Sequence, residues 1–277
     1  MRGVAAPVLF VHGVRTSRTM WRAQVEALEQ LGHRTLAIDL PGHGARAGEP
    51  FTLTEAAATV HAGVRELAEH SGGASVVVVG LSLGAYVTLH AIARDTSGVG
   101  AVVAAGCCTP PGSAVLHGWA LLARAIVAAP DGGARLNQFM VDRTLSPQAA
   151  VDIAAGGFAL DVMDDMLREI ADADPLADLA EIEVPVWLVN GRYDHFRGRE
   201  RAYVRAANDA RLRVVRGAKH LVSLDAPVPF TRIVLEAAAE VEAAEVEAAA
   251  EVEARTAVSR HERRASSGAG SRRAPRR

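Results

Sequence analysis

The sequence is poor in cysteine, lysine and aromatic residues. Its 277 residues include two cysteines, and aromatic residues make up 4% of the chain. Cys107 and Cys108 are adjacent and cannot form a disulfide framework, which favours a reducing, cytoplasmic location. No apolar run approaches the roughly 18 residues that a membrane-spanning helix needs. The 30 Lys and Arg against 32 Asp and Glu leave a net charge of -2, so we expect neither a nucleic-acid nor a membrane partner.

Apolar residues make up 49% of the chain, which is enough to bury a large core. Short β-branched runs alternate along the chain with segments whose apolar residues recur at helical spacing. The expected strands are 8–11, 35–39, 76–79, 99–103, 186–189 and 213–215. Strands that alternate with helices predict βαβ units, and the continuous apolar runs indicate burial on both faces. The predicted fold class is therefore α/β, with a doubly wound, mostly parallel sheet of about six strands.

Local signals place several helix ends. The pattern Thr52-x-x-Glu55 is a capping box and predicts a helix start, and Gly32 marks a helix end. Ser146-Pro147 is an N-cap followed by proline at the first helical position. A further helix is expected over 158–171. Between the fourth and fifth strands these helices form an insertion large enough for a lid, although a long crossover would show the same pattern.

The expected organisation has four parts. The core is 1–106 with 184–235, the helical cap is 107–183, an Ala/Glu-rich helical extension covers 236–254, and a basic disordered tail covers 255–277. Alanine and glutamate favour helix, but Val241, Val246 and Val252 are spaced five and six apart and build no continuous stripe. We therefore expect the extension to reach into solvent rather than pack.

The segment from Ser75 to His90 carries the main chemical signal. It runs from a valine-rich strand through Gly80-Leu-Ser82-Leu-Gly84 directly into a helical pattern. Glycines on both sides of a serine allow a sharp turn that exposes the hydroxyl at a helix N-terminus, where negative charge is favoured. A serine hydroxyl hardly ionises at neutral pH, so a nucleophilic Ser82 needs a base.

Three more segments end predicted strands with groups that fit this chemistry. His220 follows the last strand and can serve as the base, and Asp194 follows the preceding strand and can hold the imidazole. His12-Gly13 ends the first strand, and a backbone N–H just beyond it can form an oxyanion hole with the N–H of Leu83. All these groups lie at carboxyl ends of strands, where open α/β sheets place their sites.

With these motifs in this order, residues 8–220 resemble the α/β-hydrolase superfamily. The resemblance implies that Ser82 is the nucleophile, Asp194 the acid and His220 the base, with the N–H groups of Val14 and Leu83 as the oxyanion hole. It also implies that 107–183 is the cap that shapes the substrate pocket. Epoxide hydrolases and haloalkane dehalogenases in this superfamily carry aspartate at the nucleophile position, and Ser82 argues against both.

Other polar residues fit supporting roles. His12 is expected to support the oxyanion turn, His43 to belong to a turn, and Asp39 to anchor a loop. Arg15 and Arg18 follow the oxyanion turn and either face solvent or steer an anionic substrate. No histidine or cysteine spacing fits a metal site and no glycine-rich loop fits a phosphate site, so we expect neither metal nor cofactor.

The sequence therefore predicts a serine hydrolase acting on a small-molecule carboxylic ester, lactone or thioester through an acyl-serine intermediate. Two alternatives stay open: the same three groups used for C–C hydrolysis, lyase or cofactor-free peroxidase chemistry, and a non-catalytic ligand-binding protein. Six large apolar residues of the expected cap fit either an apolar pocket wall or core packing. They are Trp119, Phe139, Met140, Phe158, Met163 and Met166. Monomer and homodimer are both compatible with the sequence.

Overall fold

The structure of the chain is a computed structural model. It describes residues 5–113, 118, 121, 124, 128, 131, 133–160, 162–171 and 173–268, with side chains as far as residue 256. Trp119, one of the expected cap residues, lies outside the described residues.

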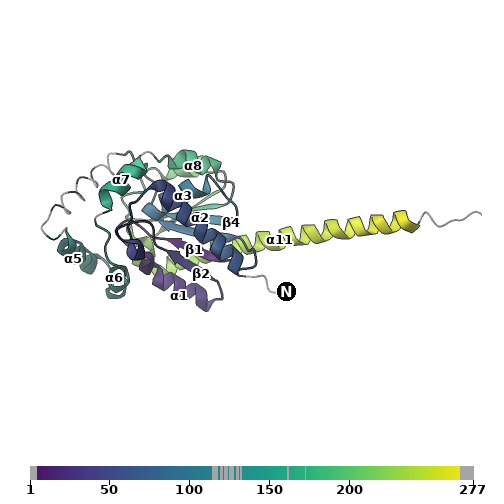
Figure 1. Ribbon diagram of the computed structural model, residues 1–277, viewed down its shortest axis with the longest axis horizontal. Helices are drawn as coiled ribbons and strands as arrows, with labels where there is room; N and C mark the ends of the chain where they lie inside the picture. The colour runs from purple at the N-terminus through teal and green to yellow at the C-terminus, as the bar shows by residue number, and fades with distance from the viewer. Residues whose placement is uncertain are drawn as a thin grey trace, which may run out of the picture.

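Six parallel strands form a single sheet in the order β2-β1-β3-β4-β5-β6 (Figure 1). They are β1 (Val8–Val11), β2 (Thr35–Ile38), β3 (Val76–Leu81), β4 (Val99–Ala105), β5 (Val186–Gly191) and β6 (Ala210–Val215). Every residue of β1, β3 and β5 is buried, whereas the edge strand β2 is half-buried. The α/β class and the parallel sheet predicted from the sequence are confirmed.

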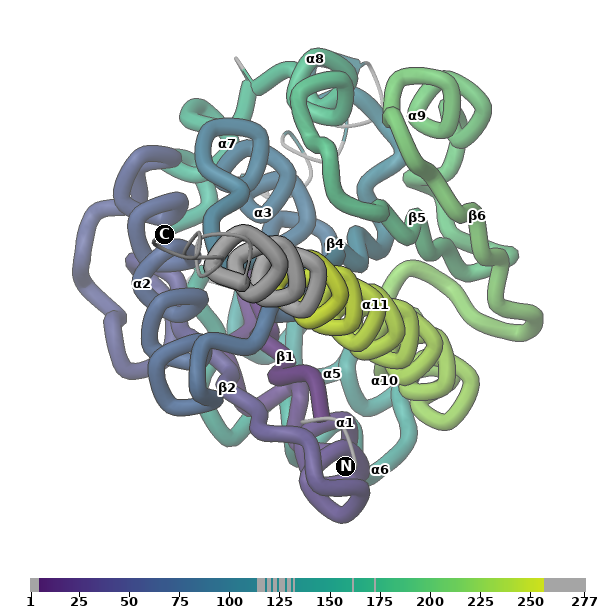
Figure 2. The backbone as a smooth tube through the Cα atoms, turned by 90° about the vertical axis from the view of Figure 1, so that its right-hand side faces the viewer, coloured from purple at the N-terminus to yellow at the C-terminus, as the bar shows by residue number. Residues whose placement is uncertain are grey.

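Helices cover both faces of this sheet. One face packs against α2 (Leu53–His70), α3 (Leu83–Ile92), α8 (Pro175–Glu181) and α9 (Glu200–Ala206). The other packs against the 3-10 helix η1 (Arg18–Trp21), α1 (Arg22–Gln30), α10 (Val222–Asp225) and α11 (Pro227–Gly268). In Figure 2, α8 and α9 lie on one side of the strands and α1 and α10 on the other.

Side chains alternate between these two layers along each strand. Leu9 and Val11 pack in the layer of α2 and α3, whereas Val8 and Phe10 pack in the layer of α1 and α11. This period of two is the geometry of an extended strand, so a strand covered on both faces must be apolar at every position. The continuous valine run of β3 meets this requirement.

The predicted helix starts are present in the structure. Thr52 caps α2 by accepting a hydrogen bond from the N–H of Glu55 at 3.1 Å. Ser146 caps α6 (Pro147–Ala154) by accepting from the N–H of Ala149 at 3.3 Å. The helix expected from Phe158 begins later, as α7 (Met163–Ala171).

Three of the helices between β4 and β5 gather at one end of the molecule (Figure 1). They are α5 (Ala134–Thr144), α6 and α7. The expected cap range 107–183 also includes α8, but α8 packs against α3 and α9 in the layer beside the sheet. Helix α6 contacts η1, and Asp152 of α6 accepts hydrogen bonds from Arg22 at 2.6 and 3.0 Å. These contacts join α6 of the inserted helices to η1 and α1, the two helices that follow β1.

Helix α11 differs in two ways from the extension expected over 236–254, because part of it packs on the sheet and because it continues beyond residue 254. Its first part packs on the sheet, where Val241 is 4% exposed, while Val246 and Val252 are exposed as expected. Glu242 and Glu245 accept hydrogen bonds from the N–H groups of Ala6 and Ser75. The helix then continues to Gly268, past Arg255 where we expected disorder to begin (Figure 1).

The composition of this segment explains the continued helix. Between Pro229 and Gly268 the sequence has neither proline nor glycine, and alanine, glutamate and arginine all favour helix.

Among the described residues, no helix is long and apolar enough to cross a membrane.

Candidate active site

Ser82 lies on a sharp turn between β3 and α3. Its backbone has φ 55° and ψ -116°, a conformation that residues with a side chain rarely adopt. The flanking glycines make this turn possible, because a Cβ on Gly80 would lie 2.5 Å from the carbonyl oxygen of Gly84. A Cβ on Gly84 would overlap the carbonyl oxygens of Val11 and His12. The turn therefore holds the Ser82 hydroxyl above the carboxyl edge of the sheet.

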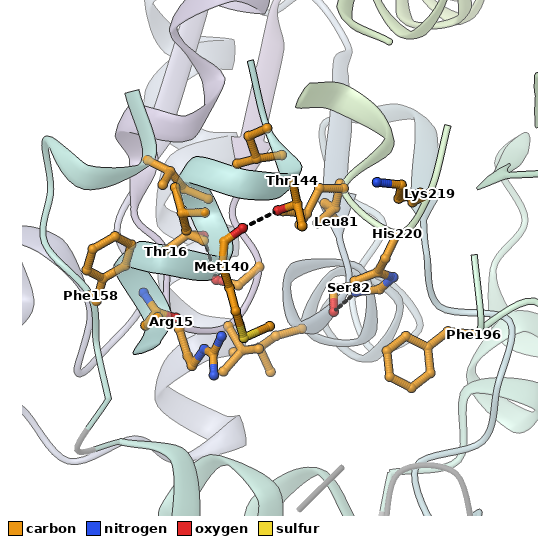
Figure 3. Close-up of a pocket in the computed structure, with 18 of the residues that line it drawn as sticks. Arg15, Thr16, Leu81, Ser82, Met140, Thr144, Phe158, Phe196, Lys219 and His220 are labelled. Atoms are coloured by element: carbon orange, nitrogen blue, oxygen red, sulfur yellow. Dashed lines mark hydrogen bonds between the residues drawn. The ribbon is translucent and has the colours of Figure 1, made fainter. Parts of the chain in front are cut away.

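The structure brings Ser82, His220 and Asp194 together from three different strand ends. The Nε2 atom of His220 lies 3.0 Å from the Oγ atom of Ser82 (Figure 3). The Nδ1 atom of the same ring lies 3.1 and 3.2 Å from the two carboxylate oxygens of Asp194. Because Asp194 accepts the Nδ1 proton, Nε2 is left free to accept the proton of the serine hydroxyl.

Asp194 is held as a carboxylate inside the protein. Its side chain is fully buried, whereas that of His220 is 19% exposed. Burial by itself would raise the pKa of Asp194, but the hydrogen bond and charge of His220 and the N–H of Phe196 together keep that pKa below its ordinary value. The Phe196 N–H donates to Oδ1 at 2.8 Å, and its ring packs edge-on against His220 with the centroids 4.7 Å apart.

The sequence analysis did not single out Phe196, although it lies two residues after the proposed acid. An aspartate that accepts the N–H two residues ahead is a common turn pattern, and this was the available signal.

The turn after β1 lies directly beside Ser82. The carbonyl oxygen of Gly13 accepts hydrogen bonds from His12 Nδ1 and from the Thr16 hydroxyl, both at 2.8 Å. The carbonyl and the following N–H of a trans peptide point in opposite directions, so these two bonds fix the direction of the Val14 N–H. In the described part of the chain, neither the Val14 N–H nor the Leu83 N–H donates to a protein acceptor. Both donors are available to a bound group.

His12 supports this turn as a neutral side chain. Its Nε2 atom accepts the N–H of Leu40 at 3.0 Å while Nδ1 donates to Gly13. Burial and the neighbouring charge of His43 lower the pKa of His12 to about 3. His12 therefore ties the end of β1 to the loop after β2, in the supporting role expected from the sequence.

Asp39 anchors the same region. Its carboxylate accepts the backbone N–H of Arg18 at 2.7 Å and that of Ala45 at 3.0 Å. The Arg18 guanidinium lies 3.6 Å from the same carboxylate. Asp39 is thus a loop anchor, and Arg18 is paired with it.

A cavity of about 400 Å³ opens beside Ser82 and His220. Much of its lining is apolar and comes from the inserted helices. Met140, Phe158, Met163 and Met166 are part of it, and Met163 and Met166 also belong to the buried core, so these two residues fit both interpretations. Phe139 is not part of the lining and is 59% exposed. The sequence analysis missed Asn137, a polar residue of α5 that lines the cavity, because a single asparagine in a helix carries no distinguishing pattern.

Comparisons with known proteins agree with this architecture. The model of the alpha/beta hydrolase family matches residues 8–233. The fold is similar to that of a bromoperoxidase from Bacillus anthracis, at 22% identity and a TM-score of 0.70, over 85% of this chain and 92% of the other. It is also similar to a thermophilic esterase from Thermogutta terrifontis, at 23% identity and a TM-score of 0.67, over 87% and 92%. An enol-lactonase from Burkholderia xenovorans has 20% identity and a TM-score of 0.65, over 84% and 91%.

The fold and the family match define an enzyme of the hydrolase class. This chain belongs to the alpha/beta hydrolase family, as the sequence motifs predicted. The solved structures are similar in fold, and the activities that their names state differ from one protein to the next.

Proposed function

We propose that this chain is a serine hydrolase that cleaves a small carboxylic ester, lactone or thioester. The observation that carries the proposal is the continuous hydrogen-bonded series from Ser82 Oγ through His220 to the buried Asp194. This series lies beside a cavity with room for a small substrate. The proposed roles are nucleophile for Ser82, general base for His220 and orienting acid for Asp194.

In the proposed reaction, Ser82 Oγ attacks the acyl carbon while its proton moves to His220 Nε2. The carbonyl oxygen becomes an oxyanion that the N–H groups of Val14 and Leu83 stabilise. His220 then gives its proton to the leaving oxygen or sulfur, and the bond to the acyl carbon breaks. A water molecule attacks the acyl-serine with His220 again as the base, and this step releases the acid and restores Ser82.

Two features support an acyl substrate of modest size. Apolar side chains form much of the cavity wall, which suits the hydrocarbon part of an ester or lactone. The names of two proteins with a similar fold, an esterase and an enol-lactonase, describe reactions of this type.

The test is the mass of the intact protein after incubation with a fluorophosphonate. Natural protein should gain one adduct, and Ser82→Ala should gain none while unfolding at the same temperature. A folded natural protein that stays unlabelled, or a Ser82→Ala variant that is labelled equally, would contradict the proposal.

The second candidate is the use of the same three groups without an acyl-enzyme. The fold similarity to proteins described as bromoperoxidases favours keeping it. Rapid quenching during turnover of a slow ester separates the two, because ester hydrolysis through Ser82 leaves a covalent acyl-serine. Simple proton abstraction by His220 leaves no adduct.

A further inference from the structure

Arg15 places a cation in the cavity beside the proposed oxyanion turn. It directly follows Val14 and is part of the cavity lining, and Figure 3 shows it next to Met140 and Phe158. Its backbone has φ 60°; Arg15 and Ser82 are the two residues other than glycine with positive φ among the described residues. Such strained conformations persist where the surroundings hold them, and they gather at functional sites.

This guanidinium has no counter-ion in the part of the chain that the structure describes. The next two arginines along the chain are both paired, Arg18 with Asp39 and Arg22 with Asp152. Arg15 makes neither an ion pair nor a side-chain hydrogen bond within the described residues. Burial lowers its pKa, which reflects the loss of water around the charge. A partly dehydrated cation without a partner favours the binding of an anion.

Asn137 adds an independent, uncharged donor to the same cavity. Its side chain is 3% exposed and lines the cavity from α5, one turn before Met140. Its Nδ2 atom is buried and has no hydrogen-bond partner among the described residues. A buried amide donor of this kind is unfavourable unless a ligand supplies an acceptor. Residues three apart on a helix share a face, so Asn137 and Met140 project from the same side of α5, and Figure 3 shows Arg15 next to Met140.

Asp225, the acidic residue of the cavity lining, is not an ion-pair partner of Arg15. Asp225 accepts the backbone N–H of Lys219 at 2.7 Å. Figure 3 shows Lys219 on the opposite side of Ser82 from Arg15. The donors of Arg15 and Asn137 therefore lack partners among the described residues, whereas the carboxylate of Asp225 is already engaged.

We propose that Arg15 and Asn137 form a carboxylate-binding subsite, so that the substrate is an ester, lactone or thioester that carries a free carboxylate. The two oxygens of a carboxylate match a guanidinium and an amide donor, whereas a phosphate would require more donors than this subsite provides. This inference rests on the proposed hydrolase function, and it names the substrate class of the same site.

The first test compares two 4-nitrophenyl esters that differ at the far end of the acyl chain, where one carries a carboxylate and the other a neutral methyl ester. They are mono-4-nitrophenyl adipate and its methyl ester, and the readout is the ratio of their kcat/KM values. Natural protein should prefer the acid. Arg15→Met should lose about 10- to 100-fold in kcat/KM for the acid, as expected for a hydrogen bond to a charged group, with little change for the methyl ester. Asn137→Leu should lose less, because its donor is neutral.

Matched variants separate this subsite from the general charge of the protein. Arg18→Met removes the same charge three residues away, and Gln138→Met changes an exposed amide of α5 that is bonded to Asp142. Both should keep the preference for the acid. Methionine is unbranched at Cβ like arginine, so the positive φ at position 15 costs both residues about the same. We therefore expect Arg15→Met to keep the turn. A natural protein without the preference, or an Arg15→Met variant that keeps it, would overturn the proposal.

A binding measurement distinguishes failure of the subsite from failure of the hydrolase proposal. Calorimetry compares hexanoate with hexanamide on Ser82→Ala and on Ser82→Ala combined with Arg15→Met. Ser82→Ala should bind hexanoate more tightly than hexanamide. The double variant should bind hexanoate about 10-fold or more weakly than Ser82→Ala does. If the esters are not hydrolysed but this difference appears, the subsite stands without the hydrolase function. Equal hexanoate affinity in the two variants would exclude the subsite whatever the activity.

Discussion

Gly106, at the end of β4, lies directly against the ring of His220. A Cβ built on Gly106 would lie 3.1 Å from Cε1 and 3.2 Å from Nδ1 of His220, and 3.3 Å from Oδ2 of Asp194. The backbone of Gly106 also has φ 63°, which favours glycine. The contact between His220 and Asp194 therefore depends on the absence of a side chain at position 106.

From this relationship we expect Gly106→Ala to impair the site more than the fold. The added methyl group would push the imidazole away from Ser82 and Asp194, and misplaced catalytic groups lose about 100-fold in rate per ångström. The imidazole must shift by a few tenths of an ångström, so the rate of fluorophosphonate labelling should fall about 3- to 10-fold, while the unfolding free energy falls by about 1 kcal/mol from backbone strain. An unchanged labelling rate in the folded variant would contradict this account.

Asp194→Asn should reduce the reactivity of Ser82 about 10⁴-fold. The carboxylate accepts hydrogen bonds from both Phe196 N–H and His220 Nδ1. An amide whose oxygen accepts from Phe196 presents its NH₂ group to His220, which requires the tautomer with the proton on Nε2 and removes the base. Labelling kinetics measure the effect, and urea unfolding shows whether the fold survives. A loss below about 10-fold would exclude this role for Asp194.

The free energy of unfolding should decrease as the pH falls below neutrality. The folded pKa of His12 is lowered to about 3, while the unfolded side chain titrates near 6.5. Below the unfolded pKa the unfolded chain takes up a proton that the folded chain does not, so stability is lost between these two values. Burial also lowers the pKa values of His43 and His195, and both act in the same direction.

Urea unfolding at several pH values between 7.5 and 4.5 measures this loss, which is about 1.4 kcal/mol per pH unit for each proton. His12→Gln should be less stable at pH 7.5, because the buried hydrogen bonds to Gly13 and Leu40 are disturbed. It should also show a shallower dependence on pH. An equal slope in both proteins would rule out His12 as a source.

Truncation of α11 should separate its packed part from its exposed part. Removing the chain after Leu235 deletes Ala237, Ala238 and Val241, which are buried against the sheet. The loss should be about 3 kcal/mol or more, given the apolar surface exposed. Truncation after Glu247 keeps these residues and both glutamate hydrogen bonds, so it should leave the unfolding free energy unchanged. Equal stability of the two truncated chains would contradict the packing seen here.

Local sequence determined the class of fold and the identity of the candidate residues. Continuous valine runs with helical stripes between them predict a parallel sheet covered on both faces, because each pattern reflects a local backbone geometry. Gly80 and Gly84 beside Ser82 indicate that backbone segments pass so close at this turn that any side chain would block them. Asp194 and His220 could be selected because the chemistry of a serine nucleophile requires an acid and a base at neighbouring strand ends.

Tertiary structure alone decided how these residues meet and what surrounds them. The distances within the group of Ser82, His220 and Asp194 and the space left by Gly106 depend on segments far apart in the chain. The same is true of Arg15 and Asn137, whose side chains have no partner among the described residues. The packing of Val241 on Gly100 also escaped the sequence analysis, because a spacing of five and six residues describes one helix and not the surface it meets. Periodicity is a property of the local backbone, whereas burial, pairing and cavity shape arise from contacts between distant segments.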